Sequence, residues 1–469
     1  MMLQKVIGLE IHVELKTETK MFCACPSRFG GAPNTRVCPV CLGHPGSLPA
    51  VNKKAVEYSL SAACALGCEI SPVTVFERKN YFYPDLPKGY QISALRHPLA
   101  RGGGLDTPDG FVRIHEIHME EDAGKLVHEG GHTLLDFNRC GVPLIEIVTE
   151  PDIRSAKQAT DFLSSLKSRF EYLGISDMKI QEGSMRVDVN ISVREDGAPL
   201  GNRCELKNLS SFRSVERAIE YEAQRQSEIL AAGETVEVQT RRFDESGGKT
   251  VFMRKKEEAG EYRYYPEPNI PPLRFSKDEV ERIKSALPEF AEQKAERYQK
   301  EYMLSQADAQ IIASSPFLAE IFEKSTAKGA PAKEVRFLLV GEALCHAGKR
   351  GKAPEELGIS PDKVAFIASA LAEGSINRAA AKEVFEKSLD GSDPDEYIKE
   401  HSLAQIGDSA QIESAARSVI AENPDMLAQY RAGKTKVFAA FVGKTMGALG
   451  GRADPGVVRD TLSKLLEND

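Results

Sequence analysis

The sequence KVIGLEIHVEL at residues 5–15 alternates apolar and polar side chains. Because successive side chains of a β-strand point to opposite faces, one face of this segment is apolar and the other carries Glu10, His12 and Glu14. Carboxylates and an imidazole are donors that bind divalent cations. We therefore predict a strand whose apolar face covers a core and whose polar face can hold a metal, although the wet side of an ordinary antiparallel strand has the same composition.

Polar side chains recur in three other segments with strand character, at residues 112–119, 144–149 and 186–193. In the second of these, Glu146 interrupts a run of Ile and Val that should be buried, and a buried carboxylate needs a cation or hydrogen-bond donors. Several such strands favour one shared active-site floor. The candidate groups are Glu120, Glu121, Glu146, Glu150, Arg186, Asp188 and Asn190. The sequence does not decide which glutamate of the 120/121 pair, or of the 146/150 pair, is a ligand.

The composition bounds the class of protein. A chain of 469 residues suggests about three domains. Its net charge of −8 excludes a uniformly basic nucleic-acid binder, so any RNA contact must come from a local patch. No stretch approaches the roughly 18 apolar residues of a membrane helix, and the N-terminus lacks the pattern of a secretory signal. We expect a cytoplasmic protein with no membrane partner.

The character of the sequence changes near residue 275. Before it, short alternating runs punctuated by Gly and Pro predict a largely antiparallel sheet, with a hairpin turning at residues 246–248 and a helix over 214–230. The proline-rich stretch 265–275 reads as a linker or an extended crossing. Beyond it, helical periodicity and capping residues predict only helices. The fold class is therefore α+β. The expected domains are the sheet domain at 1–275, an all-α middle at 276–404 and a small helical tail at 405–469.

Four of the nine cysteines are close in sequence: Cys23, Cys25, Cys38 and Cys41. In a long chain of a reducing compartment, cysteines at such spacing point to a metal more than to disulfides. Two thiolate pairs joined by a loop supply the tetrahedral sulfur set that Zn²⁺ prefers, and they leave no open position for substrate. We predict a structural Zn²⁺ site in the loop 23–41, although one residue separates the first pair where two to four are usual.

Gly247, Gly248, Lys249 and Thr250 resemble the end of a phosphate-binding P-loop, but Phe243 stands where the first glycine of that motif belongs. The surrounding segment also reads as a hairpin, whereas a P-loop joins a strand to a helix. We reject the motif and expect cationic side chains to bind phosphate groups. The candidates are Arg78, Lys79, Lys88, Arg186 and Lys207.

Aromatic residues are interleaved with some of these cations in residues 78–91, and residues 262–265 repeat the mixture. Aromatic rings among cations suit stacking against a nucleobase. An ordinary packed loop has the same composition, so the two interpretations are equally supported by the sequence.

Nine runs of the sequence resemble the motifs of one family, the B subunits of aspartyl/glutamyl-tRNA(Asn/Gln) amidotransferases (the GatB/GatE family). They are IGLEIHVEL, CPVCLGHPGSLP, RKNYFYPDLPKGYQIS, HMEEDAGK, NRCGVPLIEIVTEPDIRS, EGSMRVDVNIS, ELKNLSSF, TRRFDESGGKT and YRYYPEPNIPPL. The resemblance implies a catalytic cradle domain similar in fold to glutamine synthetase and guanidino kinases, followed by a helical middle and a small helical tail that contacts tRNA.

The resemblance also implies a reaction. Family members phosphorylate the side-chain carboxylate of Glu-tRNA(Gln) or Asp-tRNA(Asn) with ATP and Mg²⁺, and ammonia then displaces the phosphate. In the matching motifs, the expected Mg²⁺ ligands are His12, Glu121 and Glu146. The residues expected to line the same catalytic cavity are Glu10, His12, Lys79, Arg186 and Asp188. The expected substrate-binding residues are Tyr81, Tyr83, Lys88, Ser184 and Lys207.

Partners are expected because no Gly/Ser-rich segment of the amidase type is found in this chain. The resemblance implies an amidase A subunit that supplies ammonia from glutamine, and a small C subunit. Residues 426–453 hold five cations and no acid, which suits contact with tRNA phosphates, although a solvated helix face has the same pattern. These cations are Arg431, Lys434, Lys436, Lys444 and Arg452.

Two other classes of protein are considered. A non-catalytic, zinc-containing tRNA-binding scaffold would use the cysteine loop and the basic tail, and it would not turn over ATP. An aminoacyl-tRNA synthetase would need a nucleotide-binding motif of the HIGH or KMSKS type, and neither is found.

Overall fold

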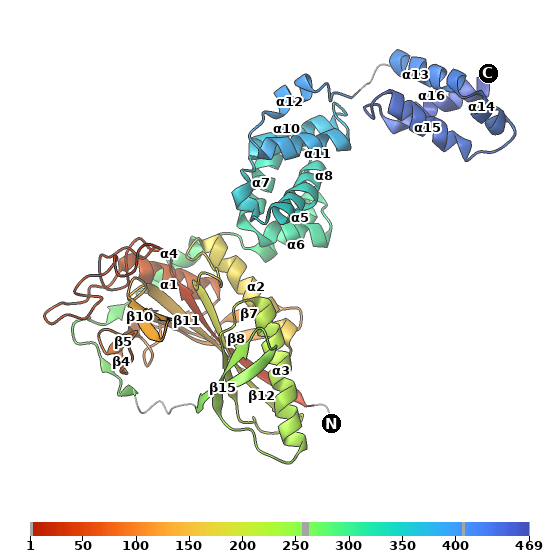
Figure 1. The fold of residues 1–469 in the computed structure, drawn as a ribbon. Coiled ribbons are helices and arrows are strands. Elements are labelled where there is room, and N and C mark those ends of the chain that lie inside the picture. The colour runs from red at the N-terminus through yellow and green to blue at the C-terminus, as the bar shows by residue number, and fades with distance from the viewer. Residues whose placement is uncertain (1–2, 256–261, 406–408, 469) are drawn as a thin grey trace. The chain divides into compact units, whose positions relative to one another are not determined.

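The computed structural model describes residues 3–255, 262–405 and 409–468 (Figure 1). The chain forms two compact units, Met1–Glu289 and Phe290–Asp469. The first unit runs past the predicted boundary at residue 275 because α4 (Lys277–Ser285) packs against α1 (Lys53–Ala65). Ser276 caps α4, its hydroxyl accepting a hydrogen bond from the Glu279 N–H.

A large sheet organises the first unit. Its main path has the strand order β15-β14-β13-β12-β1-β11-β8-β5-β4-β16. These strands are β1 (Gln4–Glu14), β4 (Glu77–Asn80), β5 (Tyr90–Ser93), β8 (Gly110–Glu121), β11 (Pro143–Thr149), β12 (Met185–Arg194), β13 (Cys204–Lys207), β14 (Gln239–Asp244), β15 (Lys249–Lys255) and β16 (Tyr265–Pro266). Among the described strand pairs only β13 and β14 run parallel, so the prediction of a largely antiparallel sheet is confirmed.

Shorter strands complete this unit. They are β2 (Glu69–Ile70), β3 (Val73–Thr74), β6 (Ala100–Arg101), β7 (Gly104–Thr107), β9 (Lys125–Glu129), β10 (His132–Asp136) and β17 (Leu273–Arg274). The proline-rich stretch is the predicted extended crossing, because β16 pairs with β4 and β17 pairs with β3. The residues of the rejected P-loop lie in the turn between β14 and β15 and at the start of β15, within the predicted hairpin.

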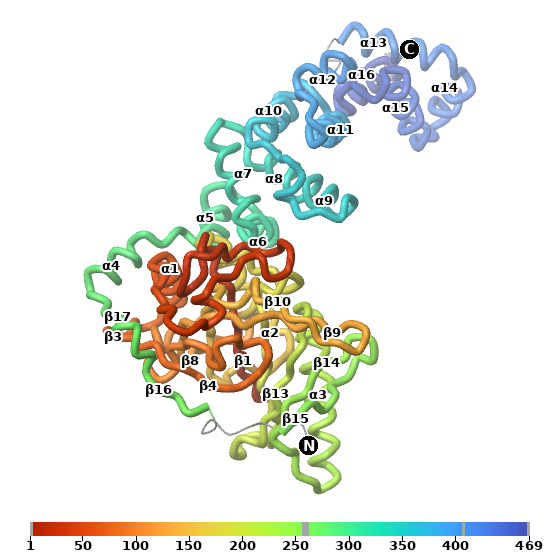
Figure 2. Tube along the Cα trace, turned by 60° about the vertical axis from the view of Figure 1, so that its left-hand side comes forward, coloured from red at the N-terminus to blue at the C-terminus, as the bar shows by residue number. Residues whose placement is uncertain are grey.

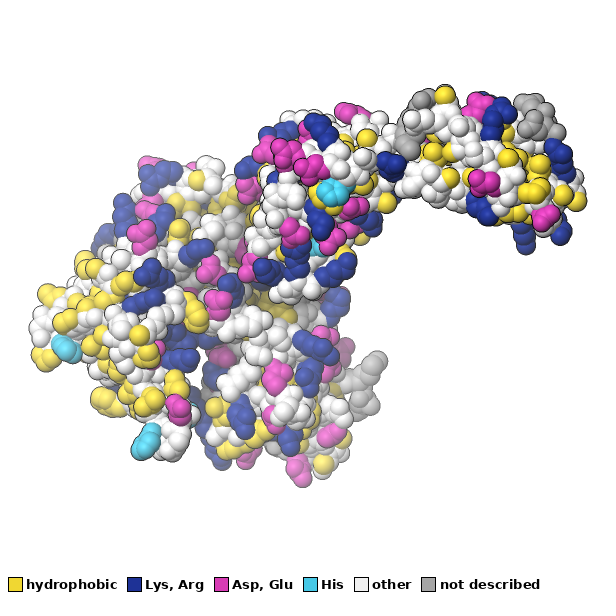
Figure 3. All heavy atoms as spheres, turned by 45° about the horizontal axis from the view of Figure 1, so that its top comes forward, with side chains coloured by type: hydrophobic (Ala, Val, Ile, Leu, Met, Phe, Trp, Pro, Cys, Tyr) yellow, Lys and Arg dark blue, Asp and Glu magenta, His cyan; other side chains and the backbone are white. Residues whose placement is uncertain are grey.

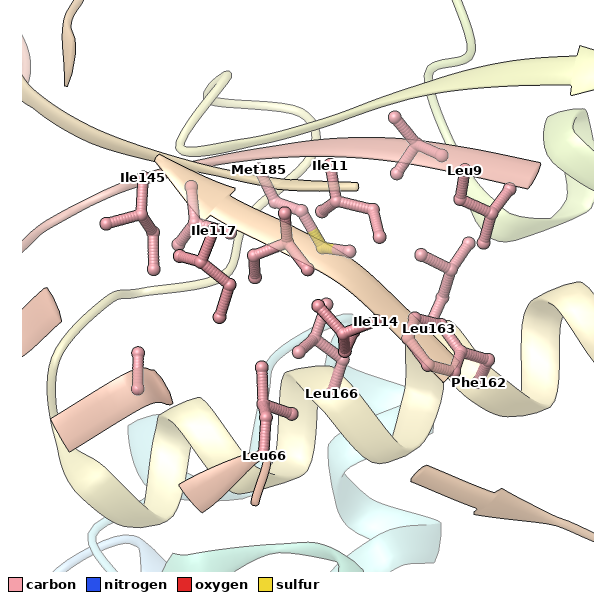
Figure 4. Packing of buried hydrophobic residues seen from close by; sticks show 14 of the residues in the cluster. Leu9, Ile11, Leu66, Ile114, Ile117, Ile145, Phe162, Leu163, Leu166 and Met185 are labelled. Carbon is pink, nitrogen blue, oxygen red and sulfur yellow. The ribbon is translucent and has the colours of Figure 1, made fainter. Parts of the chain in front are cut away.

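The apolar face of the sheet packs on helices. Leu9 and Ile11 of β1 are buried and point toward Phe162 and Leu166 of α2 (Ala156–Leu173), as Figure 4 shows. The helix α3 (Phe212–Ala231) packs beside α2 and against β12. The period-two alternation of β1 therefore places its even-numbered polar residues on the opposite face.

A long loop joins β1 to α1 and carries the four clustered cysteines (Figure 2). It is held to β10, because the Asn34 N–H donates to Asp136 Oδ1 at 3.0 Å and the Asn34 amide donates to the Leu135 carbonyl at 2.8 Å. The loop is therefore a docked part of the first unit.

Helices make up the second unit. They are α5 (Ala291–Tyr302), α6 (Gln306–Ser314), α7 (Pro316–Ala327), α8 (Ala332–Arg336), α9 (Leu344–Arg350), α10 (Pro361–Ala372), α11 (Arg378–Leu389), α12 (Pro394–Glu400), α13 (Ser409–Glu422), α14 (Pro424–Arg431), α15 (Val437–Ala448) and α16 (Pro455–Asn468). A π-helical segment, Phe337–Ala343, joins α8 to α9, and a 3₁₀ turn, Pro354–Leu357, precedes α10. In the last four helices Phe441, Val442 and Leu449 belong to a separate hydrophobic cluster.

The predicted α+β class with a helical C-terminal part is thus confirmed, whereas the likeness to glutamine synthetase stays a prediction. No helix in the described ranges combines the length and the apolar character that crossing a bilayer requires.

Candidate functional site

The polar face of the sheet forms the floor of a cavity of about 790 Å³. Strands from both halves of the sheet contribute side chains, and charged groups of both signs border a hollow in this unit (Figure 3). The charged and aromatic lining residues include Glu10, His12, Lys79, Tyr81, Glu120, Asp122, Glu146, Arg186, Asp188, Glu205, Lys207, Arg254 and Tyr262. All five residues that were predicted to line the catalytic cavity are therefore brought together.

A triad of possible metal ligands lies on the floor. The sheet register places Glu146 of β11 between His12 of β1 and His118 of β8. His12 Nε2 lies 3.7 Å from Glu120 Oε1 and 3.8 Å from Glu146 Oε1. One donor atom from each of these three side chains lies within 4.8 Å of the others, a separation that a single cation can bridge.

The pKa values of the two carboxyl groups in this triad are shifted in opposite directions. Burial raises the pKa of Glu120, and the neighbouring charge of Glu146 raises it further. Burial also acts to raise the pKa of Glu146, but His12, His118 and Lys79 outweigh it and leave that pKa lowered. Two buried carboxyl groups side by side do not both ionise readily without a positive charge between them. The donor set therefore fits a divalent cation.

Glu121, the predicted third ligand, points to the other face of β8. It forms a buried ion pair with Lys88, and its Oε1 accepts a hydrogen bond from the Ile92 N–H at 3.0 Å. Glu120 takes its place beside His12, because adjacent residues of a strand point in opposite directions. Glu150, the alternative to Glu146, lies instead 2.8 Å from the Nδ1 of His115.

Three predicted substrate-binding residues lie outside the lining of the large cavity. Lys88 lines a separate cavity of about 60 Å³ together with its partner Glu121 and with Cys41 of the cysteine loop. Tyr83 is 55% exposed. Ser184 stabilises the turn before β12, where its hydroxyl accepts from the Lys179 N–H at 2.9 Å. Lys88 is held away from the cavity because its charge pairs on the opposite face of β8.

A second acidic group lies along β1, β12 and β13. Glu10, Asp188 and Glu205 also have donor atoms within 4.8 Å of one another. Lys207 forms an ion pair with Asp188 and lies 3.6 Å from Glu205 Oε1. Asn190 donates to Glu10 Oε1 at 2.8 Å. The positive charge in this group is therefore the Lys207 ammonium. Glu205 was not among the predicted site residues. Its two-residue spacing from Lys207, which places both side chains on one face of a strand, could have indicated it.

Arg186 is bound at the other end of the floor. Its two terminal nitrogens donate to the two carboxylate oxygens of Asp122 at 3.1 and 2.8 Å. Glu14 lies beside Asp122, and burial together with the Asp122 charge raises the pKa of Glu14 to about 8. Sequence reasoning missed Asp122, because an acid that follows two glutamates reads as part of a solvated turn.

Lys79 lies between the triad and aromatic side chains. Its Nζ lies 5.1 Å from the ring centroid of Tyr262, and the Tyr262 and Tyr81 rings are 6.1 Å apart. Burial disfavours the charged form of Lys79, but Glu120, Tyr264 and Glu146 outweigh it and raise the pKa of this ammonium. Lys79 is thus a cation placed to meet an anion that enters the cavity.

The four predicted zinc ligands converge. The sulfur atoms of Cys23, Cys25, Cys38 and Cys41 all lie within 4.8 Å of one another. A hydrogen bond from Cys23 lowers the pKa of Cys41 to about 4, so one thiolate is favoured in the cluster. The buried Lys20 lies with its Nζ 3.7 Å from Cys41 Sγ, which offsets negative charge on sulfur. Four convergent thiols fit a closed tetrahedral metal site.

The cations of the tail lie on α14, on α15 and in the turns beside them. Arg431 ends α14, and Lys434 and Lys436 follow in the turn before α15; all three are exposed. Lys444 and Arg452 donate hydrogen bonds to nearby oxygen atoms, at 2.6 and 2.7 Å. The first three are therefore the better placed for a phosphate backbone.

The chain is similar to known proteins over nearly its whole length. Residues 5–281 match the family profile described as the GatB/GatE catalytic domain, and residues 320–466 match the one described as the GatB domain. The B subunit of the aspartyl/glutamyl-tRNA(Asn/Gln) amidotransferase of Lachnoclostridium phytofermentans is 46% identical over 471 residues, covering 99% of this chain and 98% of that protein. The protein of the same name from Caldicellulosiruptor saccharolyticus is 47% identical over 473 residues, with 98% of each chain covered. That from Thermodesulfovibrio yellowstonii is 44% identical over 474 residues, with 100% of each covered.

Proposed function

The chain belongs to the GatB/GatE family, and from that premise we propose that it is the B subunit of a glutamine-hydrolysing aspartyl/glutamyl-tRNA(Asn/Gln) amidotransferase, an ATP-dependent ligase. It binds a tRNA that is mischarged with Glu or Asp and converts the amino acid to Gln or Asn. The observation that carries the proposal is the convergence of His12, Glu120 and Glu146 beside Lys79 on the floor of a large cavity.

The proposed chemistry has two steps. A side-chain carboxylate oxygen of the mischarged amino acid attacks the γ-phosphorus of ATP, so that an acyl phosphate forms and ADP leaves. Ammonia then attacks the acyl carbon and inorganic phosphate leaves, which gives the amide. A free carboxylate is a poor acyl donor, so the first step supplies the leaving group. Catalysis of phosphoryl transfer rests mainly on positioning and on neutralising charge.

His12, Glu120 and Glu146 would hold Mg²⁺ in this proposal. The donor set of two carboxylates and one imidazole has room for water and phosphate oxygens, which Mg²⁺ retains in nucleotide sites. When bound, the ion supplies positive charge to phosphate oxygens. Lys79, which lines the same cavity and lies beside Tyr262, would offer a second positive charge to a phosphate oxygen.

The remaining floor residues orient the substrate. Arg186 is fixed by its two hydrogen bonds to Asp122, so its guanidinium has a defined direction. Asp188 and Glu205 share the Lys207 ammonium, Glu10 accepts a hydrogen bond from Asn190, and all of these groups except Asn190 line the cavity. These side chains are held before substrate arrives, which lowers the cost of positioning it.

Ammonia is expected from a partner, because the serine that lines the cavity, Ser210, donates its hydroxyl to the Glu245 carboxylate at 2.7 Å and has no hydrogen bond to a lysine base among the described residues. We assign that step to an amidase A subunit, assembled with this chain and a small C subunit. The thiols of Cys23, Cys25, Cys38 and Cys41 would hold a structural Zn²⁺, and the cations of the tail would contact tRNA.

The test combines the chain with its A and C partners, ATP, Mg²⁺ and glutamine. Each of Glu-tRNA(Gln), Asp-tRNA(Asn) and their uncharged forms is added in turn, and both ADP and amidated aminoacyl-tRNA are measured. We expect ADP to form only with a mischarged tRNA. Ammonium chloride in place of glutamine tests the step of this chain apart from that of the amidase. A scaffold without chemistry would give no ADP in any arm, and that result would overturn the proposal.

A further inference from the structure

Three tyrosines stand at one side of the cavity, and we call them the tyrosine wall: Tyr81, Tyr262 and Tyr264. Tyr81 follows β4, whereas the other two precede β16, so two distant segments build it. The ring centroids of Tyr81 and Tyr262 are 6.1 Å apart at an interplanar angle of 77°, and those of Tyr262 and Tyr264 are 5.9 Å apart at 57°. Tyr81 and Tyr262 line the cavity. The wall therefore offers aromatic surface to a ligand.

The wall is held in place by groups outside the cavity. The Asn80 amide donates to the backbone carbonyl of Arg263 at 2.9 Å and reaches that of Tyr262 at 3.3 Å. The two segments also pair as strands, with Arg78 opposite Tyr265. Because these bonds fix the backbone on both sides of the wall, its rings are arranged before any ligand binds.

Charge connects the wall to the metal triad. The Lys79 ammonium lies over the Tyr262 ring and interacts electrostatically with the carboxylates of Glu120 and Glu146. If the anionic group of a ligand bound between Lys79 and a cation held by the triad, the uncharged part of that ligand would lie toward the tyrosines. A phosphate with a nucleoside attached has this shape and this charge.

We propose that the tyrosine wall is a stacking subsite for the adenine of a bound adenosine. This inference rests on the proposed function, which supplies two sources of that chemistry, ATP and the 3′-terminal adenosine of the aminoacyl-tRNA. Purine rings stack well on tyrosine faces, and an ammonium that shares the site adds a cation–π contact. Stacking of this kind tolerates different bases, so the tyrosine wall would position a purine without discriminating between adenine and guanine.

The experiment uses the assembled enzyme and compares four substitutions. Tyr262→Leu and Tyr81→Leu remove one ring each, Tyr262→Phe keeps the ring, and Phe82→Leu is the matched control. Phe82 neighbours Tyr81 in sequence, but it is 84% exposed and does not line the cavity. KM for ATP, KM for mischarged tRNA and kcat are measured from ADP formation.

We expect each Leu variant of the wall to raise KM for at least one adenosine-bearing substrate by roughly 5- to 100-fold, the size of a lost base stack. Tyr262→Phe and Phe82→Leu should stay within about twofold of wild type, because both keep the stacking surface. A rise for ATP identifies the nucleotide as the occupant, and a rise for tRNA identifies the terminal adenosine.

The inference is overturned if both wall variants keep wild-type KM values for both substrates, or if Phe82→Leu changes them as much. Melting temperatures of all variants separate lost stacking from lost folding, and two different wall positions guard against one unstable variant. A wild-type enzyme that forms no ADP would overturn the proposed function itself, which is a different outcome from active enzyme with unaffected variants.

Discussion

Two buried glutamates on opposite faces of the same sheet differ in how their charge is satisfied. Glu222 lies on α3 on the apolar face and is 0% exposed. Its carboxylate accepts hydrogen bonds from Arg225 at 2.6 and 3.0 Å, from Gln226 at 2.9 Å and from Thr250 at 2.7 Å. Although burial opposes ionisation, these donors lower the pKa of Glu222. The negative charge of Glu222 is therefore stabilised entirely by side chains of the protein.

Glu120 on the polar face is equally enclosed but lacks such an environment. It faces the carboxyl of Glu146 and the imidazole of His12, whose Nε2 lies 3.7 Å from it. Burial and the Glu146 charge raise the pKa of Glu120. The difference indicates that Glu222, surrounded by donors, serves the fold, whereas Glu120, placed against another acid, is the group to which the proposed function assigns a bound cation.

The largest expected effect is on catalysis. His12→Ala, Glu120→Gln and Glu146→Ala should each lower ADP formation by at least ~10³-fold, because each removes a donor to the proposed metal and charge stabilisation of this kind is worth several kcal/mol. ADP release is measured with mischarged tRNA and ammonium chloride. Near-normal rates in any two of the three would refute the assignment of the triad.

Glu121→Gln is the matched control for Glu120→Gln. It changes the next residue of β8, on the other face, where the carboxylate pairs with Lys88. We expect it to lower the melting temperature, since breaking a buried pair is destabilising, while the Mg²⁺ concentration that gives half-maximal ADP formation stays near that of wild type. A lost Mg²⁺ response in Glu121→Gln, with a normal one in Glu120→Gln, would reverse the assignment.

Substitutions in the cysteine cluster should have the opposite profile to those in the triad: a large loss of stability and little direct change in the rate of ADP formation. Metal analysis of the purified protein should find about one equivalent of Zn²⁺. Cys38→Ser should lower the melting temperature and the zinc content together, because binding free energy of a structural metal contributes to folding. Cys345→Ser, which changes an exposed cysteine outside the cluster, should leave both unchanged. A fully stable protein without zinc would contradict this prediction.

Glu222→Gln tests the other side of the comparison. It should lower the free energy of unfolding by about 3 kcal/mol, the lower end of the cost of breaking a buried ion pair, and it should leave the KM for ATP unchanged. The pKa of Glu222 is lower in the folded protein, so its carboxylate stabilises the fold above the unfolded-state pKa of about 4.3. That stability is lost as pH falls through the folded-state pKa.

Urea unfolding from pH 7 down to pH 3 measures this effect. The wild type should lose stability more steeply than Glu222→Gln at the acid end. Glu220→Gln, a more exposed neighbour on α3 that pairs with Lys5, is the control and should follow the wild-type pH dependence. If the free energy of unfolding fell equally steeply with decreasing pH in wild type and Glu222→Gln, the buried charge of Glu222 would not be the cause of the acid destabilisation.

The parts of the site that sequence could predict are those set by local periodicity. Alternation in β1 placed His12 on a polar face, and the interruption of an apolar run marked Glu146. The choice between Glu120 and Glu121 depends on which of them lies on the same face of the sheet as Glu146, and the register in which β8 pairs with β11 decides this. Asp122 gains its role only through contact with a distant arginine.

The packing beyond the predicted domain boundary could not be predicted for a similar reason. Helical periodicity begins at Ser276 as predicted, but it does not reveal that α4 packs on α1, which lies more than 200 residues earlier in the sequence. The proline-rich crossing was predicted from its composition, whereas its pairing with β4 and β3 depends on tertiary contacts.

The smallest expected effect concerns the basic tail. Lys434 and Lys436 are exposed in the turn between α14 and α15, far in sequence from the cavity residues. Reversing both charges to Glu should raise KM for mischarged tRNA by roughly tenfold and lower the slope of log affinity against log salt by roughly one for each phosphate that is no longer neutralised. At saturating tRNA, kcat should be unchanged, because binding that is lost equally from ground state and transition state raises KM alone.

The matched control reverses Lys349 and Lys352, two exposed lysines that lie at the end of α9 and just after it in the same helical unit. It changes the net charge of the protein by the same amount, so a general electrostatic effect would appear in both variants, whereas a local phosphate contact would appear only in the tail variant. Equal KM values and equal salt slopes for the two double variants would mean that the tail cations only solvate a helix end. A fall in kcat for the tail variant would mean instead that the tail acts on the phosphoryl-transfer step, and the separation between a tRNA-positioning tail and a chemical cavity would then be wrong.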